Sequence, residues 1–241
     1  MDEHMIKLFE CTYKKLCPVS YGSPQGELVK KLFADYDLSV HPGSPNSIGK
    51  VEFTANPLCM DLSLDGVLEG RVWIHMSWMD DRLVWNPEDH KGINQLRVPV
   101  NKLWKPDIVP YIKKDITEIQ EEFNAVVYSN GKVLYVPDTK LRLYCDNANL
   151  TDVWAVHECN IKYGSWTFDN NLMELVEIKH PVDVSEFVKF CPMKTLEVIK
   201  ELKIKAYVCC PEHYASFDYT LKLQRKFLKN GCWTHLQSKL Y

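Results

Sequence analysis

Two adjacent cysteines, Cys209 and Cys210, give this sequence its most distinctive chemistry. Bonded to each other, they would close a very small ring and distort the peptide between them, which would stiffen the tip of a loop. Alternatively, each thiol bonds elsewhere or stays free. A free thiol close to His213 would suggest a Cys–His pair that activates a nucleophile, although an exposed loop histidine beside a disulfide is the commoner arrangement. An enzyme that uses Cys209 or Cys210 would therefore show a labile thiol.

Five aromatic side chains are candidates for binding a cation, because each occurs in or beside a turn-rich stretch at the end of an expected strand. They are Trp73, Tyr111, Trp166, Tyr207 and Tyr214. Core packing is the commoner role for any single ring of this kind. Gathered around a stiffened loop, however, they would form an aromatic box. A quaternary ammonium has no N–H to donate, and ring faces attract it by roughly 0.5–2 kcal/mol per well-placed ring.

The remaining cysteines indicate the compartment. Cys145 and Cys159 enclose thirteen residues, and a bridge there would stabilise the fold by about 3 kcal/mol in the chain-entropy model. The sequon at Asn149 lies inside that loop. Cysteines around a glycosylation site favour an oxidising, extracellular setting, so we expect a secreted chain with a glycan on Asn149, although residues 1–25 lack the apolar core of a secretory signal. The sequence leaves open how the other five cysteines pair: Cys11, Cys17, Cys59, Cys191 and Cys232.

Composition and motifs exclude several classes of function. The chain has 241 residues, 46% of them hydrophobic and 25% charged, with a net charge of −3. This balance is that of a globular protein, and it offers no basic surface for nucleic acid. No apolar run approaches the length of a membrane span, so we expect no membrane insertion. Phosphate-binding loops, nucleophile elbows and metal-ligand spacings are absent from the sequence, so we predict no catalytic residue, no cofactor and no metal.

The elements that would hold these residues are mostly strands. Ser23 as N-cap and Pro24 at the first helical position predict one early helix, with an apolar stripe that runs to Tyr36. Hydrophobic residues then alternate with polar ones over 58–64, 72–78 and 216–226. We therefore predict an all-β fold, an immunoglobulin-like β-sandwich of about ten strands with an N-terminal α-helix.

Two further segments complete this prediction. Asn130-Gly131 between two apolar runs is a strong hairpin signal. Residues 191–206 fit both a helical face and two strands, and the β context with Pro192 favours strands. We expect an N-terminal extension over 1–22, one ligand-binding domain over 23–228 and a C-terminal tail over 229–241.

The chain resembles the extracellular ligand-binding domain of the Cys-loop, or pentameric ligand-gated, receptors, most closely the nicotinic type and the soluble acetylcholine-binding proteins. The resemblance covers roughly 200 of the 241 residues. It rests on five stretches in the order that the family shows: Trp73-Ile74 with 78–87, 104–107 with Tyr111, the Cys145–Cys159 loop, 162–167 and 207–214.

The resemblance implies a homopentamer or heteropentamer that binds acetylcholine or a nicotinic amine between subunits; we expect a homopentamer. It also implies disulfides Cys145–Cys159 and Cys209–Cys210. In the family one subunit supplies a principal face, and the matching positions are Tyr111, Trp166, Tyr207, Cys209, Cys210 and Tyr214. The neighbour supplies a complementary face, matched by Trp73, Leu134 and Val136, and a variable segment that would fall within 183–195.

Departures from the family pattern favour the soluble binding proteins over channel subunits. Receptor subunits carry Phe-Pro-Phe-Asp in the cysteine loop, whereas residues 152–158 lack this run. Lys162 matches a family lysine, but the position of its usual acidic partner is Ser216, so that ion pair is lost or moved to Asp218. We therefore expect a secreted protein similar to acetylcholine-binding protein; the alternative is the extracellular domain of a channel subunit.

Overall fold

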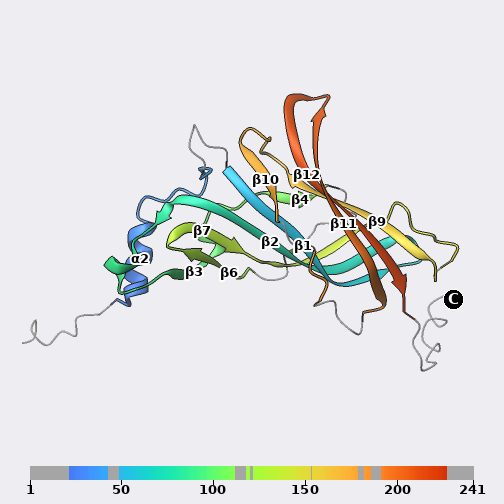
Figure 1. The fold of residues 1–241 in the computed structure, drawn as a ribbon, viewed down its shortest axis with the longest axis horizontal. Helices are drawn as coiled ribbons and strands as arrows, with labels where there is room; N and C mark the ends of the chain where they lie inside the picture. Colours follow the sequence, from blue (N-terminus) through green and yellow to red (C-terminus); the bar gives the residue numbers. More distant parts are fainter. Residues whose placement is uncertain are drawn as a thin grey trace, which may run out of the picture.

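Two β-sheets pack face to face in the computed structural model, which confirms the predicted all-β sandwich with an N-terminal helix (Figure 1). The structure describes residues 22–42, 49–111, 118–119, 122–152, 154–178, 182–185 and 191–226. Most of the expected N-terminal extension, the C-terminal tail and the cysteines Cys11, Cys17 and Cys232 lie outside the described residues.

The larger sheet has eight strands and the smaller has four. The larger contains β1 (Gly49–Leu62), β2 (Val67–Val84), β3 (Gln95–Pro99), β5 (Glu118–Ile119), β6 (Asn124–Tyr128), β7 (Asn130–Tyr135), β8 (Asp138–Tyr144) and β10 (Met173–Glu177). The smaller runs in the order β11 (Met193–Tyr207), β12 (Cys210–Arg225), β9 (Val156–Ser165) and β4 (Ile108–Pro110). Short 3-10 turns occur at η1 (Pro87–His90) and η2 (Val100–Lys102).

Helix α2 (Pro24–Leu32) begins where the capping pattern predicted. The Ser23 hydroxyl accepts a hydrogen bond from the Gly26 N–H at 3.1 Å, which satisfies a donor that the first turn leaves unpaired. Leu28 is fully buried against the sandwich. One apolar side of the helix therefore closes the end of the core.

The predicted hairpin at Asn130-Gly131 joins β6 to β7. Gly131 has a φ of 84°, and a Cβ there would lie 2.8 Å from the Asp80 carbonyl oxygen on β2. Only glycine fits such a close approach. Residues 193–207 form the single long strand β11, so the preference for β structure over a helix in this segment is confirmed.

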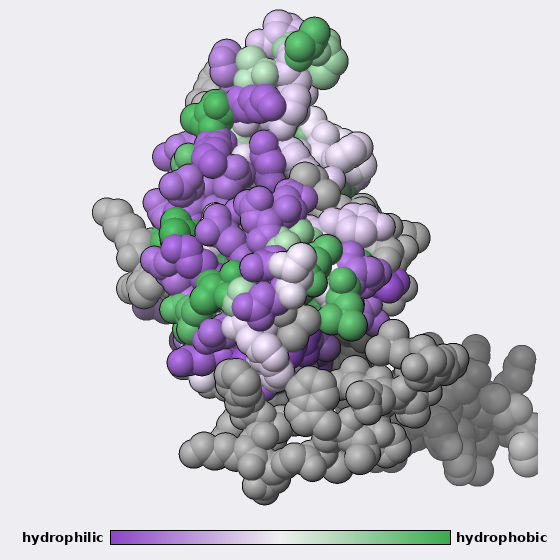
Figure 2. Space-filling model, turned by 90° about the vertical axis from the view of Figure 1, so that its right-hand side faces the viewer, coloured by the Kyte–Doolittle hydropathy of each residue, from purple (hydrophilic) through white to green (hydrophobic). Residues whose placement is uncertain are grey.

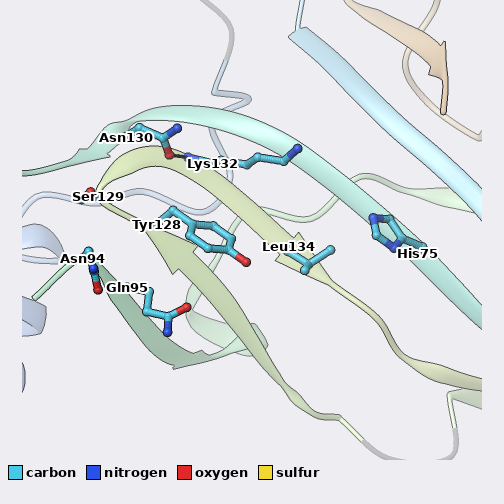
Figure 3. A pocket seen from close by; sticks show the side chains of 8 residues that line it. All are labelled: His75, Asn94, Gln95, Tyr128, Ser129, Asn130, Lys132 and Leu134. Atoms are coloured by element: carbon cyan, nitrogen blue, oxygen red, sulfur yellow. Dashed lines mark hydrogen bonds between the residues drawn. The ribbon is translucent and has the colours of Figure 1, made fainter. Parts of the chain in front are cut away.

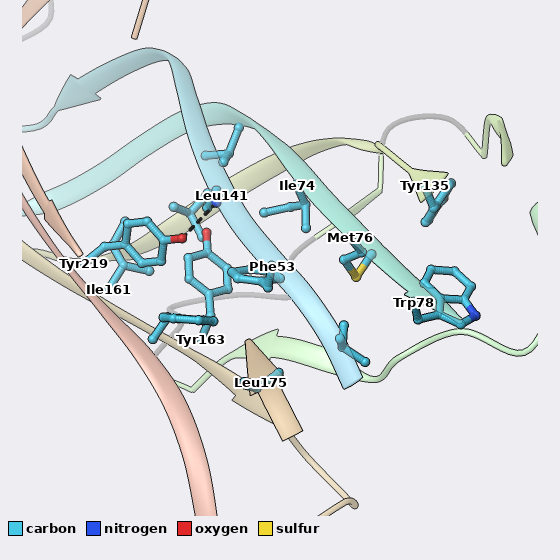
Figure 4. Packing of buried hydrophobic residues seen from close by; sticks show 14 of the residues in the cluster. Phe53, Ile74, Met76, Trp78, Tyr135, Leu141, Ile161, Tyr163, Leu175 and Tyr219 are labelled. Atoms are coloured by element: carbon cyan, nitrogen blue, oxygen red, sulfur yellow. Dashed lines mark hydrogen bonds between the residues drawn. The ribbon is translucent and has the colours of Figure 1, made fainter. Parts of the chain in front are cut away.

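Aromatic rings from both sheets meet in the core (Figure 4). Phe53 of β1 lies 5.3 Å from the Tyr163 ring and 6.0 Å from the Phe217 ring, measured between centroids. The Ala55 N–H donates to the Tyr219 hydroxyl at 3.0 Å, so a backbone group of one sheet is satisfied by a side chain of the other. These contacts fix how the smaller sheet, which carries most of the candidate site, sits on the larger.

Three disulfides connect described residues. Cys145–Cys159 and Cys209–Cys210 pair as the resemblance implied. The third, Cys59–Cys191, joins β1 to the residue just before the Pro192 turn into β11, and the sequence had left this pairing open. It links the two sheets at the base of the β11–β12 hairpin.

Candidate functional site

The β11–β12 hairpin projects from the sandwich (Figure 1). A cavity of about 310 Å³ lies at its tip. It gathers all six residues expected on the principal face. The lining comprises Tyr111, Ser165, Trp166, Tyr207, Cys209, Cys210 and Tyr214. Tyr111 follows β4, Ser165 ends β9 and Trp166 follows it, and the others belong to the β11–β12 hairpin. The four strands of the smaller sheet therefore bring these residues together from separate parts of the sequence.

Asp107, just before β4, holds the segment that carries Trp166. Its carboxylate accepts hydrogen bonds from the Ser165 hydroxyl at 2.5 Å, the Thr167 N–H at 2.7 Å and the Thr167 hydroxyl at 2.6 Å. The backbone N–H of Trp166 donates to the Asp107 backbone carbonyl at 3.3 Å. With its backbone held in this way, the Trp166 side chain stays 71% exposed, open to a ligand.

Tyr111 is fixed through its hydroxyl. This group donates to the Ser165 carbonyl at 2.9 Å, and the space it occupies requires glycine at 164, because a Cβ there would lie 2.4 Å from the hydroxyl oxygen. Burial, together with nearby Tyr207, raises the pKa of Tyr111 to about 12. The phenol therefore remains neutral at physiological pH and presents an uncharged ring.

The four rings form two edge-to-face pairs. Tyr111 and Trp166 have centroids 6.3 Å apart at 86°, and Tyr207 and Tyr214 have centroids 5.9 Å apart at 70°. Such T-shaped pairs orient ring faces in more than one direction. The cavity is thus walled by ring faces and by the disulfide between Cys209 and Cys210, as a box for a cation requires.

The expected complementary residues lie elsewhere on the chain. Trp73, Leu134 and Val136 alternate with buried neighbours on β2 and at the end of β7, so they point out of the larger sheet. Trp73 is 39% exposed and Val136 is 37% exposed. Neither lines the aromatic cavity. Within one chain the structure therefore keeps the two expected faces apart.

Leu134 lines a second, larger cavity of about 690 Å³ (Figure 3). The Tyr128 ring points toward the Leu134 side chain, and His75 of β2 lies beyond Leu134 at one end of the lining. The lining is mainly polar: His75, Asn94, Gln95, Tyr128, Ser129, Asn130, Lys132 and Leu134. The sequence analysis missed His75, although it stands two residues after Trp73 and so shares its face of the strand.

Charges beside this second cavity are paired. Lys132 Nζ lies 3.1 Å from Glu52, which also accepts a hydrogen bond from Ser77. The Ser77 hydrogen bond and Lys132 lower the pKa of Glu52. Burial, reinforced by Lys132 and opposed by Glu52, lowers the pKa of His75. The imidazole is therefore neutral at physiological pH and can both donate and accept a hydrogen bond.

Two other expected positions are partly described. Asn149 is exposed, and its side-chain oxygen accepts from the Thr151 hydroxyl at 2.8 Å. Glycosylation there stays a prediction. Of the variable segment expected within 183–195, residues 186–190 lie outside the described residues.

Residues 25–227 match the family described as the neurotransmitter-gated ion-channel ligand binding domain. The chain is also similar to curated nicotinic subunits. It is 29% identical to neuronal acetylcholine receptor subunit alpha-2 of Gallus gallus, over 85% of this chain and 40% of the relative. It is 28% identical to acetylcholine receptor subunit alpha-like 2 of Drosophila melanogaster, over 88% and 40% respectively. The corresponding values for subunit alpha-L1 of Schistocerca gregaria are 29%, 83% and 38%. The chain thus spans about two fifths of the length of these relatives.

Proposed function

The chain belongs to the neurotransmitter-gated ion-channel ligand-binding domain family, and from that premise we propose that it binds acetylcholine or a related amine in an aromatic box between subunits. Tyr111, Trp166, Tyr207 and Tyr214 would receive the cationic group, and Cys209 and Cys210 would close over it. Binding involves no covalent step, and the family is one of receptor domains rather than enzymes.

The observation that carries this proposal is the aromatic cavity itself. Its lining contains four rings, one disulfide and Ser165, and none of these described lining residues carries a carboxylate. A quaternary ammonium offers no hydrogen to donate, so ring faces are the groups that can recognise it. The cavity volume is in the lower part of the range for small-molecule pockets. A ligand of the size of acetylcholine suits such a box.

Assembly into a homopentamer would complete the site. The aromatic cavity leaves one side open to solvent in a single chain, and the outward residues Trp73, Leu134 and Val136 belong to a different surface. When one surface patch meets a different patch of the next copy, the contact is heterologous, and it closes into a ring where the rotation between copies closes. Such a ring would place the face of Trp73 against the hairpin of the neighbouring subunit.

The test is a tryptophan-fluorescence titration of the purified protein with acetylcholine, nicotine and serotonin in turn. We expect saturable quenching that the Trp166→Ala variant loses while remaining folded by circular dichroism. Trp154→Ala is the matched control, since Trp154 lies in the Cys145–Cys159 loop and not in the cavity. A folded protein that responds to none of the three ligands would disprove the proposal for this class of amine.

Two candidate settings follow, and different observations support each. A secreted, free-standing binding protein is supported by residues 152–158, which lack the Phe-Pro-Phe-Asp run of receptor subunits. A channel subunit is supported by the relatives, which are acetylcholine receptor subunits of greater length. None of the helices that the structure describes is long and apolar enough to cross a membrane. The full-length transcript distinguishes the two, because a channel subunit continues into four apolar segments.

The end of the molecule with the Cys145–Cys159 loop also bears on the channel candidate. Leu64 of the β1–β2 turn and Leu150 line one shallow hollow there and are exposed, as are Tyr144 and Val156. Figure 2 views the molecule from this end and shows apolar groups between hydrophilic ones. Exposed apolar clusters commonly mark contact surfaces. In a channel subunit this end would contact the rest of the protein.

A further inference from the structure

Two lysines lie beside rings of the aromatic box, although neither lines the cavity itself. Lys162 Nζ on β9 lies 3.4 Å from the Tyr207 hydroxyl oxygen, 5.5 Å from the Tyr111 ring centroid and 5.9 Å from the Tyr207 ring centroid. Lys205 Nζ on β11 lies 5.1 Å from the Tyr207 ring centroid. These are cation–π distances. Tyr111 and Tyr207 therefore each have an ammonium nearby before any ligand arrives.

The other half of the box has no such neighbour. Among the cation–π contacts of the described residues, none involves Trp166 or Tyr214. Trp166 is also the most exposed ring of the four. The box thus has a side that is already positively charged, at Tyr111 and Tyr207, and a side that is open to a cation, at Trp166 and Tyr214.

The carboxylate opposite Lys162 is engaged by a different lysine. Asp218 lies opposite Lys162 in the β9–β12 register, but it pairs with Lys203 at 3.1 Å. Lys203 also binds Glu201 at 3.3 Å. Ser216, where the family has the acidic partner, offers only a hydroxyl. Within the described part of the chain no ion pair joins Lys162 or Lys205 to a carboxylate. The sequence analysis expected the ion pair of Lys162 to be either lost or moved to Asp218, and the structure shows its loss.

A ligand that carries only a positive charge would therefore meet a like charge beside the box, whereas a carboxylate on the ligand would receive a charge-assisted hydrogen bond there. From this asymmetry we infer that the site selects a zwitterionic ammonium ligand. Its cationic head binds the rings of Trp166 and Tyr214, and its carboxylate binds Lys162. This inference rests on the proposed function, since it names the ligand class of the same box.

Choline and glycine betaine form the matched pair for the test, because they share a trimethylammonium head and differ in carrying a hydroxyl or a carboxylate. Both are titrated into the intact protein, with Trp fluorescence as the readout. We expect betaine to bind about tenfold tighter than choline, or more. The Lys162→Gln variant should lose this preference, because betaine binds more weakly while choline binds at least as well.

Two further variants separate charge from structure. Lys162→Arg keeps the positive charge and should keep the betaine preference. Lys222→Gln removes a lysine further along β12 that pairs with Glu197 of β11. This variant should bind both ligands as the wild type does. Equal or tighter binding of choline by the wild type would overturn the inference and leave the proposed function standing. An unchanged preference in Lys162→Gln would also overturn it. If folded protein bound neither ligand nor acetylcholine, the proposed function itself would fail.

Discussion

Tyr111 brings two groups to the aromatic cavity, and the structure gives them different tasks. The ring forms part of the wall, while the hydroxyl donates to the Ser165 carbonyl and so ties the segment of Tyr111 to that of Trp166. This separation matters because a cation is attracted to the ring and does not need the hydroxyl. The hydroxyl can be removed by substitution with Phe while the ring stays in place.

The Tyr111→Phe variant should lower the free energy of unfolding by about 1 kcal/mol, since one half-buried hydrogen bond is lost. Acetylcholine affinity should fall less than in Trp166→Ala, because the ring stays in place. Urea unfolding and the fluorescence titration measure the two effects. Complete loss of binding in a folded Tyr111→Phe protein would show that the hydroxyl, and not the ring, makes the essential contact.

His75 makes the stability of the fold depend on pH. Its pKa in the folded protein lies below the ordinary value of 6.5, because the side chain is half-buried. The unfolded chain therefore takes up a proton at higher pH than the folded chain does. The free energy of unfolding should fall as the pH drops through 6.5, until the folded protein is protonated as well.

The measurement is urea unfolding between about pH 7.5 and 5.5. The His75→Gln variant should show a smaller loss of stability over this range than the wild type. His41, whose pKa is also lowered by burial, keeps part of the dependence. His213→Gln serves as the control, because His213 is exposed on the hairpin. A wild-type slope in His75→Gln would contradict the assignment.

At the scale of elements, the Cys59–Cys191 disulfide ties β1 of one sheet to the start of β11 in the other. The bridged residues are 132 positions apart, against 14 for Cys145–Cys159. In the chain-entropy model the longer loop gives the larger stabilisation, about 5 kcal/mol against about 3 kcal/mol. The β11–β12 hairpin, which carries half of the aromatic cavity, is anchored by this bond.

Replacing both Cys59 and Cys191 by Ser should therefore lower the free energy of unfolding by about 5 kcal/mol, more than replacing Cys145 and Cys159 does. Chemical denaturation of the two double variants measures the difference. Peptide mapping of the native protein first establishes that the bond is present. A smaller effect for the longer loop would mean that the disulfide does not restrict the unfolded chain as the model assumes.

Local signals predicted the elements well because their causes are local. Ser23 caps a helix through a contact three residues away, and Gly131 makes its turn within a few residues. The Cys59–Cys191 bond and the roles of His75 and Lys205 escaped prediction, since each depends on which strands are neighbours and in which register. The family resemblance, and not periodicity, predicted that the principal-face residues would share one site.

At the scale of the whole molecule, the two expected binding faces share no residue and sit on different sheets. The aromatic cavity belongs to the smaller sheet, and Trp73, Leu134 and Val136 belong to the outer side of the larger sheet or its edge. One chain alone therefore cannot wrap a ligand with both. The proposed ring of copies would solve this, because every copy would offer one face to each neighbour.

This geometry leads to a complementation experiment. Trp166→Ala removes the principal face of a subunit and Trp73→Ala removes its complementary face, so each variant alone should bind no acetylcholine. The two variants are then unfolded together, refolded and shown to co-assemble. An interface in the mixed ring has both tryptophans only where a Trp73→Ala subunit supplies the hairpin and a Trp166→Ala subunit supplies the opposing face. Random assembly of equal amounts produces this arrangement at about a quarter of the interfaces. Recovery of about a quarter of the wild-type sites would therefore locate the site between subunits, whereas mixed rings without any recovery would show that each chain binds its ligand alone.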